Sequence, residues 1–393
     1  MTNIVKLYQD LKGDKSIWLI VTLLLFASLL AVYSSVGSIA YKYKDGNTEF
    51  YLIQQIVFIV GGFGLMWVCY KMDYRKYARF APILLVVAIG ALLYTFFFGV
   101  EINEAKRWIT IPWIDKTFQT SDFAKIALII YLARSIATKQ DIIKDVKTAL
   151  IPLFLPIIIV CGIIAPNNLS TAGLLFVTCM LMLFVGRISL KFIFLLLLLA
   201  VIMGVMITLF GIAFPEHVRI ETWITRITNF WNISDGDWQV QQAKIAIAEG
   251  GIFGVGPGNS IQKNHLPYAY ADCIYAIICE EFGLIGGLVI LWLYLWLLIR
   301  CITIVTKSPK AFGAILAMGL CLDIVINAFA NISVSVQLIP ATGLTLPLIS
   351  MGGTSLLLTC ISFGIILSVS RFVESYNITS IHQENKLSHE SID

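Results

Sequence analysis

The chain has 393 residues, of which 58% are hydrophobic and 13% are charged. Soluble domains are about half apolar and about a quarter charged, so this composition excludes an ordinary soluble protein and predicts a polytopic membrane protein. The 28 basic and 24 acidic residues give a net charge of +4. Because the basic residues are spread over many loops, this charge indicates no nucleic-acid partner.

Apolar runs of about 20 residues cross a bilayer as helices, and the sequence contains ten candidate spans. They lie at about 17–38, 51–70, 79–99, 121–138, 149–165, 170–187, 192–213, 271–300, 311–335 and 353–373. The first is too long for the apolar part of a cleaved signal peptide, so we expect no cleavage. The fold class predicted is an all-α polytopic membrane protein of about ten transmembrane helices, with a large loop between spans seven and eight.

The distribution of Lys and Arg predicts the orientation, because cytoplasmic loops carry an excess of both. If the N-terminus is cytoplasmic, 18 of these residues fall in cytoplasmic segments, 9 in outer segments and Lys125 within a span. The sequence therefore predicts a cytoplasmic tail at 1–16, a transmembrane domain at 17–375 and a polar cytoplasmic tail at 376–393. Loop 214–270 is then extracytoplasmic.

That large loop contains two helical patterns. Residues 218–231 repeat apolar side chains near a period of 3.6, which indicates an amphipathic helix in the membrane interface, and Trp238–Glu249 is similar. The following run, Gly250–Ser260, resembles a phosphate loop but lacks the Lys-Ser/Thr ending and follows no strand. We therefore reject nucleotide binding and predict a tight glycine turn.

Asp272 is the most informative residue of the chain. The stretch His265–Gly287 runs from a polar loop into an apolar helix and places Asp272 about where water meets lipid. An ionisable group at that depth is costly unless it is used or satisfied. One interpretation is a base that acts on a membrane-anchored substrate, and the other is a cap of the first helical turn.

Other charged residues at or within the spans also allow two interpretations. Arg107 and Trp108 form either an interface anchor or an anion clamp, and Asp122 with Lys125 forms either an internal ion pair or part of a catalytic site. Three further carboxylates within spans each require a partner or a wet cavity, and a structural polar contact is the alternative. They are Glu280, Glu281 and Asp323.

The segment Pro340–Leu357 combines two prolines and three glycines with apolar side chains. Irregular backbone at membrane depth is tolerated only where it is buried in protein or lines a cavity. We therefore expect a re-entrant loop whose hydroxyls and free amides contact a polar headgroup. Its candidate binding residues are Ser350, Gly352, Gly353, Thr354 and Ser355.

Together these motifs resemble the SEDS family (shape, elongation, division and sporulation), the FtsW/RodA type of peptidoglycan glycosyltransferase. The resemblance covers nearly the whole chain, and the sequence of Gly343–Ser350 is more similar to that of the division member than to that of the elongation member. It rests on Ala31–Ser35, Lys106–Trp108, Gln119–Lys125, Gly251–Ser260, Asp272–Gly286 and Leu344–Leu357.

The chain departs from the family pattern at three places. Gln119–Asp122 reads Gln-Thr-Ser-Asp instead of Gln-Pro-Ser-Glu, which shortens the acidic side chain near Lys125. Asn168 stands in place of an aspartate, so that aspartate's role cannot be transferred to it. Thr342 stands where the family often has a lysine.

The resemblance implies a lipid II polymerase that works on the outer face of the cytoplasmic membrane during cell division. A sugar 4-hydroxyl attacks the anomeric carbon of a lipid-linked chain, and undecaprenyl pyrophosphate leaves with inversion. Such a displacement needs a base and positive charge near the pyrophosphate. Asp272 is the expected catalytic base, and Arg226 is a further source of charge. The expected substrate-binding residues are Arg107, Trp108, Asp122, Lys125, Arg219, Gln262, Lys263, Ser350, Gly352, Gly353, Thr354 and Ser355.

The expected partners follow from the same resemblance. They are lipid II, the nascent glycan chain, a class B penicillin-binding protein (a transpeptidase) and other division proteins at the septum. We expect the transpeptidase to contact spans eight and nine, at Leu291 or Ile315. The eight cysteines contain no CxxC pair and the four histidines are isolated, so a divalent cation, Mg or Mn, is the only cofactor considered. The alternatives are a flippase for lipid II and an elongation-type, RodA-like polymerase.

Overall fold

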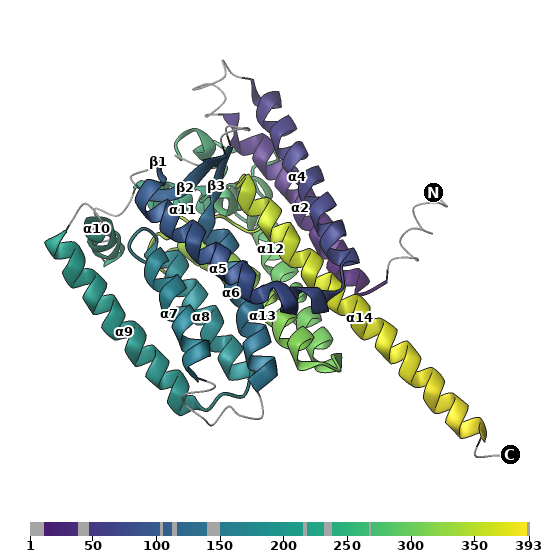
Figure 1. Cartoon of the computed structure of the whole chain (residues 1–393). Coiled ribbons are helices and arrows are strands. Elements are labelled where there is room, and N and C mark those ends of the chain that lie inside the picture. The colour runs from purple at the N-terminus through teal and green to yellow at the C-terminus, as the bar shows by residue number, and fades with distance from the viewer. Residues whose placement is uncertain are drawn as a thin grey trace.

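The computed structural model describes residues 12–37, 47–102, 105–111, 116–139, 150–214, 218–231, 238–266 and 269–390. Within them the protein is a helical bundle with a small sheet at one end (Figure 1). Ten helices coincide with the predicted spans: α2 (Lys15–Ser35), α4 (Thr48–Lys71), α5 (Tyr74–Phe98), α6 (Thr120–Lys139), α7 (Ile151–Ile164), α8 (Leu169–Val185), α9 (Leu190–Ala213), α12 (Ile274–Lys307), α13 (Ala311–Ser335) and α14 (Thr354–Glu390).

Seven helices in the described part of the chain are long and apolar enough to cross a membrane: α2, α4, α5, α9, α12, α13 and the Thr354–Asn377 stretch of α14. The helices α7 and α8 are apolar but have only 14 and 17 residues. The remaining helix, α6, has 20 residues and carries Asp122 and Lys125 among its apolar side chains. The protein is therefore mostly helical and multi-pass, while a total of ten spans stays a prediction.

The bundle is built around α13 and α14, which pack against each other and against the surrounding helices. Small residues allow close approach between α14 and α4. A Cβ atom on Gly364 would lie 2.5 Å from Met66 O, and one on Gly62 would lie 2.8 Å from Cys360 Sγ. Such contacts are typical of membrane helices, because close van der Waals packing replaces the hydrophobic effect between them.

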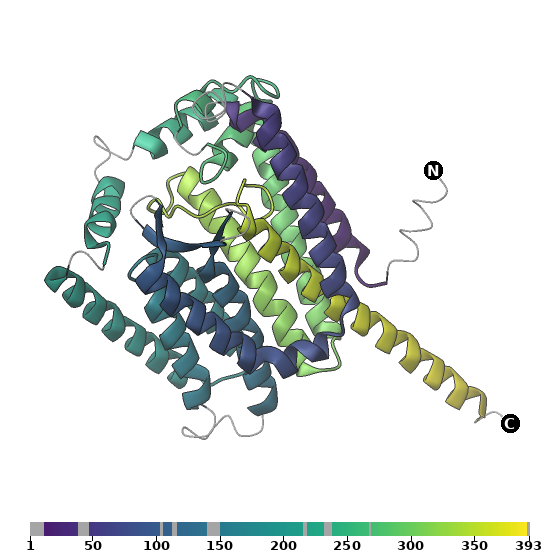
Figure 2. The same cartoon turned by 45° about the horizontal axis from the view of Figure 1, so that its top comes forward.

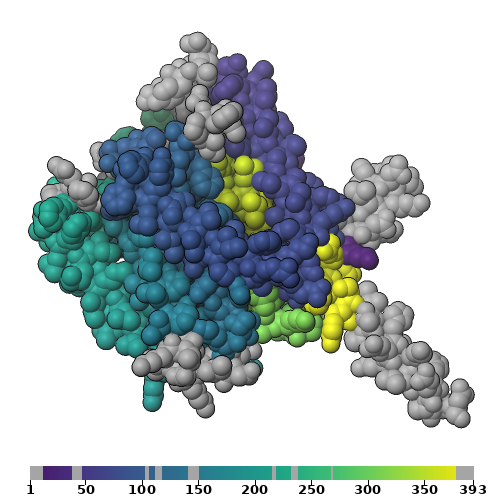
Figure 3. All heavy atoms as spheres, in the orientation of Figure 1, coloured from purple at the N-terminus to yellow at the C-terminus, as the bar shows by residue number. Residues whose placement is uncertain are grey.

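Helix α9 lies at the edge of the bundle (Figure 1). Only Ile193, Leu196 and Gly211 of its 24 residues are buried, and the other apolar side chains cover an outer face, as expected for a lipid-facing span. In the space-filling view, α9 forms one margin of the molecule, and α14 is visible between the surfaces of α4 and α5 (Figure 3).

A three-stranded antiparallel sheet corrects the expectation of an all-α fold. Strand β2 (Ala105–Ile111) pairs with β1 (Val100–Ile102) and with β3 (Lys116–Gln119). The sequence analysis treated this region as an outer loop, although its β-branched residues favour strands. The sheet fixes the position of Arg107 and Trp108, because Trp108 pairs with Gln119 immediately before α6 begins.

Helix α12 is interrupted at Gly283, where the prediction had a continuous span. Gly283 has φ +67°, outside the helical region, and the glycine turn after Gly250 replaces the missing helical hydrogen bonds. The amides of Val255 and Gly256 donate to the carbonyls of Glu280 and Glu281 over 3.0 Å each. In return, the Leu284 and Ile285 amides donate to the carbonyls of Gly251 and Ile252 at 2.9 and 3.4 Å. The backbone groups exposed by the break are thereby satisfied.

Both helices predicted in the large loop are present, as α10 (Ile220–Trp231) and α11 (Trp238–Gly250). Ile224, Ile227 and Trp231 of α10 are exposed, which fits a helix whose apolar face meets lipid. The short helix η3 (Gln262–Asn264) follows. Figure 2 shows these segments gathered at the end of the bundle that carries the sheet.

Helix α14 extends past its apolar span, which ends at Asn377. The helix continues without a break to Glu390 and projects beyond the bundle (Figure 1). Its last turns are polar, so this extension lies outside the apolar bundle. The boundary of the transmembrane domain at residue 375 and the cytoplasmic tail at 376–393 stay predictions.

Candidate active site

A cavity of about 750 Å³ opens among the sheet, the large loop and the re-entrant segment. It is large enough for a drug-sized group. Its described lining residues are Gln54, Phe58, Arg107, Trp108, Thr117, Gln119, Asp122, Lys125, Asn168, Arg219, Arg226, Gln239, Tyr270, Ala271, Asp272, Asp323, Ile324, Asn327, Gly343, Leu344, Thr345, Pro347, Met351, Gly352, Gly353, Thr354, Ser355 and Thr359.

Asp272 lies in a turn immediately before α12 and lines this cavity. The helix cap is Cys273, which makes no side-chain capping bond, so Asp272 precedes the capping position. Burial raises the pKa of the Asp272 carboxyl group, while the positive charges of Arg226 and Arg107 oppose that rise. A carboxylate with a raised pKa is a better proton acceptor than an exposed one, provided it stays ionised.

Three arginines line the cavity together with Asp272. One comes from β2, and the other two, Arg219 and Arg226, come from the residue before α10 and from α10 itself. Arg107 projects from β2 and its Nε donates to Asn167 O over 2.9 Å. Arg226, on α10, donates from Nη1 to Thr342 O over 3.2 Å. Burial, together with the nearby positive charges of Arg219 and Arg226, lowers the pKa of Arg107 to about 10. The three guanidinium groups give the cavity a positively charged lining that suits an anionic ligand.

Gly343 joins the acidic and basic parts of this site. Its φ of +64° favours glycine, and a Cβ atom there would lie 3.6 Å from Asp272 Oδ2 and 3.7 Å from Arg226 Nη2. The carboxylate and the guanidinium therefore face the same short piece of backbone in the re-entrant loop. This loop is predicted correctly as an irregular segment that lines a cavity.

A second group of charges lies deeper, on α6 and α13. Lys125 Nζ is 3.2 Å from Asp122 Oδ1 and is also attracted by the carboxylate of Asp323. The amide of Asn327 donates to Asp323 Oδ1 over 3.1 Å. The ion pair considered from sequence is therefore present, and all four side chains line the cavity.

The structure separates two predicted site residues from this cavity. Gln262 is buried, and its Nε2 lies 3.4 Å from Glu249 Oε2. Lys263 is directed toward its own loop, where Nζ donates to Gly258 O over 2.6 Å. Neither belongs to the described lining of the cavity.

Ser350 is the third predicted residue outside that lining. Its hydroxyl donates to Ala271 O over 2.6 Å and accepts from the amide of Leu346 over 2.8 Å. The other predicted residues of the re-entrant segment line the cavity: Gly352, Gly353, Thr354 and Ser355.

The two glutamates of α12 act as structural contacts rather than as cavity groups. The Glu280 carboxylate accepts from Ser260 Oγ and from the amides of Ile261 and Gln262, at 2.7 and 3.2 Å for the amides. Glu281 accepts from Ser34 Oγ. The alternative of a polar contact, rather than a role in a wet cavity, is therefore the one that the geometry supports.

Sequence analysis missed several lining residues, including Gln54, Gln239, Asn327 and Tyr270. Gln54 and Asn327 had a usable signal, because a neutral polar residue within a span also needs a partner. Gln239 and Tyr270 had none, since their position depends on how the large loop folds over the bundle. Asn168 was set aside, and it both caps α8 through Thr171 N and lines the cavity.

A family model described as "Cell cycle protein" and named for FtsW, RodA and SpoVE matches residues 14–375. The chain belongs to this family. It is the SEDS family that the motifs indicated, and the match includes the cavity-lining residues of the sheet, the large loop and the re-entrant segment.

Curated relatives in the SEDS family are similar along nearly their whole length. "Probable peptidoglycan glycosyltransferase FtsW" of Bacillus subtilis (strain 168) is 32% identical, over 92% of this chain and 91% of the relative. A Geobacter sulfurreducens protein of the same name is 31% identical, over 91% and 95%. "Stage V sporulation protein E" of Bacillus subtilis is 33% identical, over 91% and 97%.

Solved structures share the fold of this SEDS chain. One chain from "Structural coordination of polymerization and crosslinking by a peptidoglycan synthase complex" aligns with a TM-score of 0.71 at 22% identity, covering 92% of this chain and 98% of that one. Rod shape determining protein RodA of Thermus thermophilus aligns with a TM-score of 0.66 at 21% identity, covering 92% and 98%. At these identities the likeness establishes the fold alone.

Proposed function

We propose that the protein is a peptidoglycan glycosyltransferase that polymerises lipid II into glycan strands during cell division. The observation that carries the proposal is the placement of Asp272 with three arginines in one 750 Å³ cavity. A partly buried carboxylate beside concentrated positive charge suits a displacement in which a hydroxyl is deprotonated and a pyrophosphate leaves. The FtsW relatives carry the name peptidoglycan glycosyltransferase.

In the proposed reaction, Asp272 accepts the proton of the sugar 4-hydroxyl. The oxygen then forms a bond with the anomeric carbon of the lipid-linked chain, the bond from that carbon to phosphate breaks, and the configuration inverts. The leaving undecaprenyl pyrophosphate takes the bonding electrons. Arg107, Arg219 and Arg226 are placed to stabilise its growing negative charge.

The deeper group of Asp122, Lys125 and Asp323 has a different proposed role. The positive charge of Lys125 is already paired with Asp122 at 3.2 Å. We assign these residues, with Trp108 and the segment Gly352–Ser355, to binding of the sugar headgroups through hydrogen bonds and ring contacts.

A divalent cation, Mg or Mn, remains a prediction. The described residues contain no group of three His, Cys, Asp or Glu placed to hold a metal ion. Such an ion, when bound beside the pyrophosphate, would help to neutralise the leaving group.

The flippase alternative accounts less well for the site. A transporter places its substrate site near the middle of the membrane between related halves. Here many of the lining residues come from the sheet, α10, the Asp272 turn and the re-entrant loop at one end of the bundle, and the others come from helices such as α4, α6 and α13. An elongation-type role shares the same chemistry, and the FtsW names of the relatives support division instead.

We further propose that the protein lies in the cytoplasmic membrane at the septum, with both termini cytoplasmic and loop 214–270 outside. This orientation rests on the distribution of Lys and Arg in the sequence. It places the cavity on the outer face, where lipid II is polymerised in the proposed reaction.

The proposed partner is a class B penicillin-binding protein, as in a synthase that couples polymerisation with crosslinking. The similar solved chain comes from a structure described as a peptidoglycan synthase complex. The predicted contact residue Ile315 is only 4% exposed and therefore cannot serve for docking. The exposed side chains of α12, such as Leu288, Val289 and Trp292, form a better docking surface.

Purified protein incubated with lipid II in detergent tests the proposed function. Polymer formation establishes the enzyme, because no flipping is possible without a bilayer. The proposal fails if correctly folded protein forms no polymer, with divalent cations and with the transpeptidase partner added in separate trials.

A further inference from the structure

Three consecutive backbone carbonyls hold the turn that carries Asp272. Tyr270 O accepts from the Met351 amide over 2.9 Å, and Ala271 O accepts from Ser350 Oγ over 2.6 Å. Asp272 O accepts from Asn331 Nδ2 over 2.9 Å. Residues in a turn lack the hydrogen bonds of a helix, so these three contacts determine where the turn lies.

The two side chains in this set also bind the re-entrant loop. Ser350 Oγ accepts from the Leu346 amide over 2.8 Å, and Asn331 Nδ2 donates to Leu344 O over 2.6 Å. Each side chain therefore joins the Asp272 turn to residues 344–351 in a fixed relation. Asn331 comes from α13, which packs against several other helices, so it ties both segments to the core of the bundle.

Neither side chain belongs to the wall of the large cavity, although Asn331 also lines a smaller cavity of about 70 Å³ beside Asp272. Ser350 is 3% exposed and Asn331 is 2% exposed. Their neighbours Asp272 and Met351 do line it. The contacts thus lie one layer behind the cavity wall and act on Asp272 through its backbone.

We propose that Ser350 and Asn331 are positioning residues that set the place of the Asp272 carboxylate through the carbonyls of residues 271 and 272. This inference rests on the proposed function, in which Asp272 is the base. It gives Ser350 a different role from the substrate contact predicted from sequence. A displacement of about 1 Å in a reacting group can cost about a hundredfold in rate, even when substrate binding is unchanged.

The first test compares Ser350→Ala with Ser362→Ala. Ser362 is also 3% exposed, and its hydroxyl donates to Leu358 O of its own helix, at 3.3 Å. Each lost hydrogen bond costs about 1 kcal/mol. Because Ser350→Ala loses two bonds and Ser362→Ala loses one, rates are compared per folded molecule. In lipid II polymerisation, we expect Ser350→Ala to lower kcat about 10- to 100-fold with KM within about twofold, while Ser362→Ala stays near wild type.

A second variant, Asn331→Leu, keeps a similar volume and removes the donor. We again expect kcat to fall while KM stays nearly unchanged, because the carbonyls of Asp272 and Leu344 lose their shared donor. A purely structural role would lower the amount of folded protein in both variants without changing kcat per folded molecule. The proposal is overturned if kcat per folded molecule of Ser350→Ala and Asn331→Leu matches that of Ser362→Ala, or if the loss lies in KM.

Hydrogen exchange measures the same contacts without any substrate. Peptides covering residues 269–276 and 344–352 should exchange faster in Ser350→Ala than in Ser362→Ala, because the turn and the loop separate more often. Equal exchange in both variants contradicts the positioning role. The two proposals can fail separately. If the wild-type protein makes no polymer while Ser350→Ala still exchanges faster than Ser362→Ala, the proposed function is refuted and the tie between turn and loop stands.

Discussion

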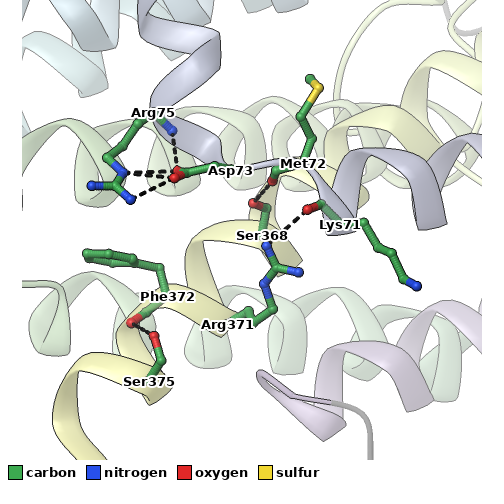
Figure 4. A network of polar contacts seen from close by, with 8 residues as sticks. All are labelled: Lys71, Met72, Asp73, Arg75, Ser368, Arg371, Phe372 and Ser375. Carbon is green, nitrogen blue, oxygen red and sulfur yellow. Dashed lines mark hydrogen bonds and ion pairs between the residues drawn. The ribbon is translucent and has the colours of Figure 1, made fainter. Parts of the chain in front are cut away.

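The two ends of the bundle use their charges differently. At the end opposite the cavity, Asp73 pairs with Arg75 at 2.7 Å, and Arg371 Nη2 donates to Lys71 O over 3.1 Å. Figure 4 shows this network, in which the charged groups bind one another or nearby backbone. The Arg371 guanidinium also lies 5.1 Å from the Tyr70 ring. These contacts join α4, α5 and α14 at a surface.

At the cavity end, by contrast, three arginines line the same cavity as Asp272. Two of them, Arg107 and Arg226, donate to the backbone carbonyls Asn167 O and Thr342 O. Concentrating like charges in a partly buried site costs stability, as the lowered pKa of Arg107 indicates. That cost is expected where an anionic ligand completes the site.

The largest expected difference between the ends is the side of the membrane that each one faces. Lys244, on α11, and Lys310, before α13, are both exposed. On a background without accessible cysteines, Lys244→Cys should react with an impermeant thiol reagent in intact spheroplasts. Lys310→Cys should react only after lysis. The reverse pattern would overturn the orientation and place the cavity on the cytoplasmic side.

Arg226→Gln tests whether the cavity end depends on its positive charge. Loss of a charged hydrogen bond to the leaving group should lower kcat/KM about 10- to 100-fold. Arg226 lowers the pKa of Asp272, so its removal should raise that pKa and move the acid limb of the pH–rate profile to higher pH. Arg75→Gln, at the opposite end, is the control. An acid limb that stays in place or moves to lower pH would contradict this account.

Gly283→Ala tests the interruption of α12. Gly283 has a positive φ, and a Cβ atom would lie 2.3 Å from Ile252 O, so the backbone must shift. Strain of this kind costs about 1–3 kcal/mol, and the thermal midpoint of the purified protein should fall. Gly90→Ala is the matched control, because a Cβ at that helical position meets no atom within 4 Å. Equal midpoints for the two variants would show that the stability of the protein does not depend on a glycine at the break in α12.

The smallest effect is expected from Arg300→Gln at the opposite end. Arg300 Nη2 lies 2.6 Å from Asp14 Oδ2, and the arginine side chain is 35% exposed. Partly exposed ion pairs contribute about 0.2–1 kcal/mol, so the midpoint should fall slightly and lipid II polymerisation should remain within about twofold of wild type. A tenfold loss of activity would mean that the two ends are coupled.

Hydrophobic runs and local periodicity were sufficient to predict the helices and the amphipathic α10. They also singled out Asp272 and the irregular segment Pro340–Leu357 as separate candidate sites, but the contact between the two comes from the structure. They could not predict the break at Gly283, because the hydrogen bonds that permit it come from the distant segment Gly251–Gly256. The strand β2 was missed for a related reason, since its pairing with β1 and β3 is a contact between segments and not a property of either one.

Roles of individual side chains were harder to predict than their neighbourhood. Lys263 and Gln262 lie near Asp272 in sequence, yet the Glu280 carboxylate holds their loop away from the cavity. Asn331 was not considered at all, because an asparagine in a helix carries no sign of which carbonyls it will meet. Such assignments require the tertiary contacts.

The central claim is that the Asp272 carboxylate accepts a proton during glycan polymerisation. The most direct test compares Asp272→Asn with Asp73→Asn in lipid II polymerisation by purified protein, with thermal midpoints measured for both. We predict that Asp73→Asn stays within about twofold of wild type. Asp272→Asn should lose about a hundredfold or more, because Asn cannot accept the proton, while keeping a near-normal midpoint. An Asp272→Asn variant that polymerises lipid II at close to the wild-type rate would contradict the account.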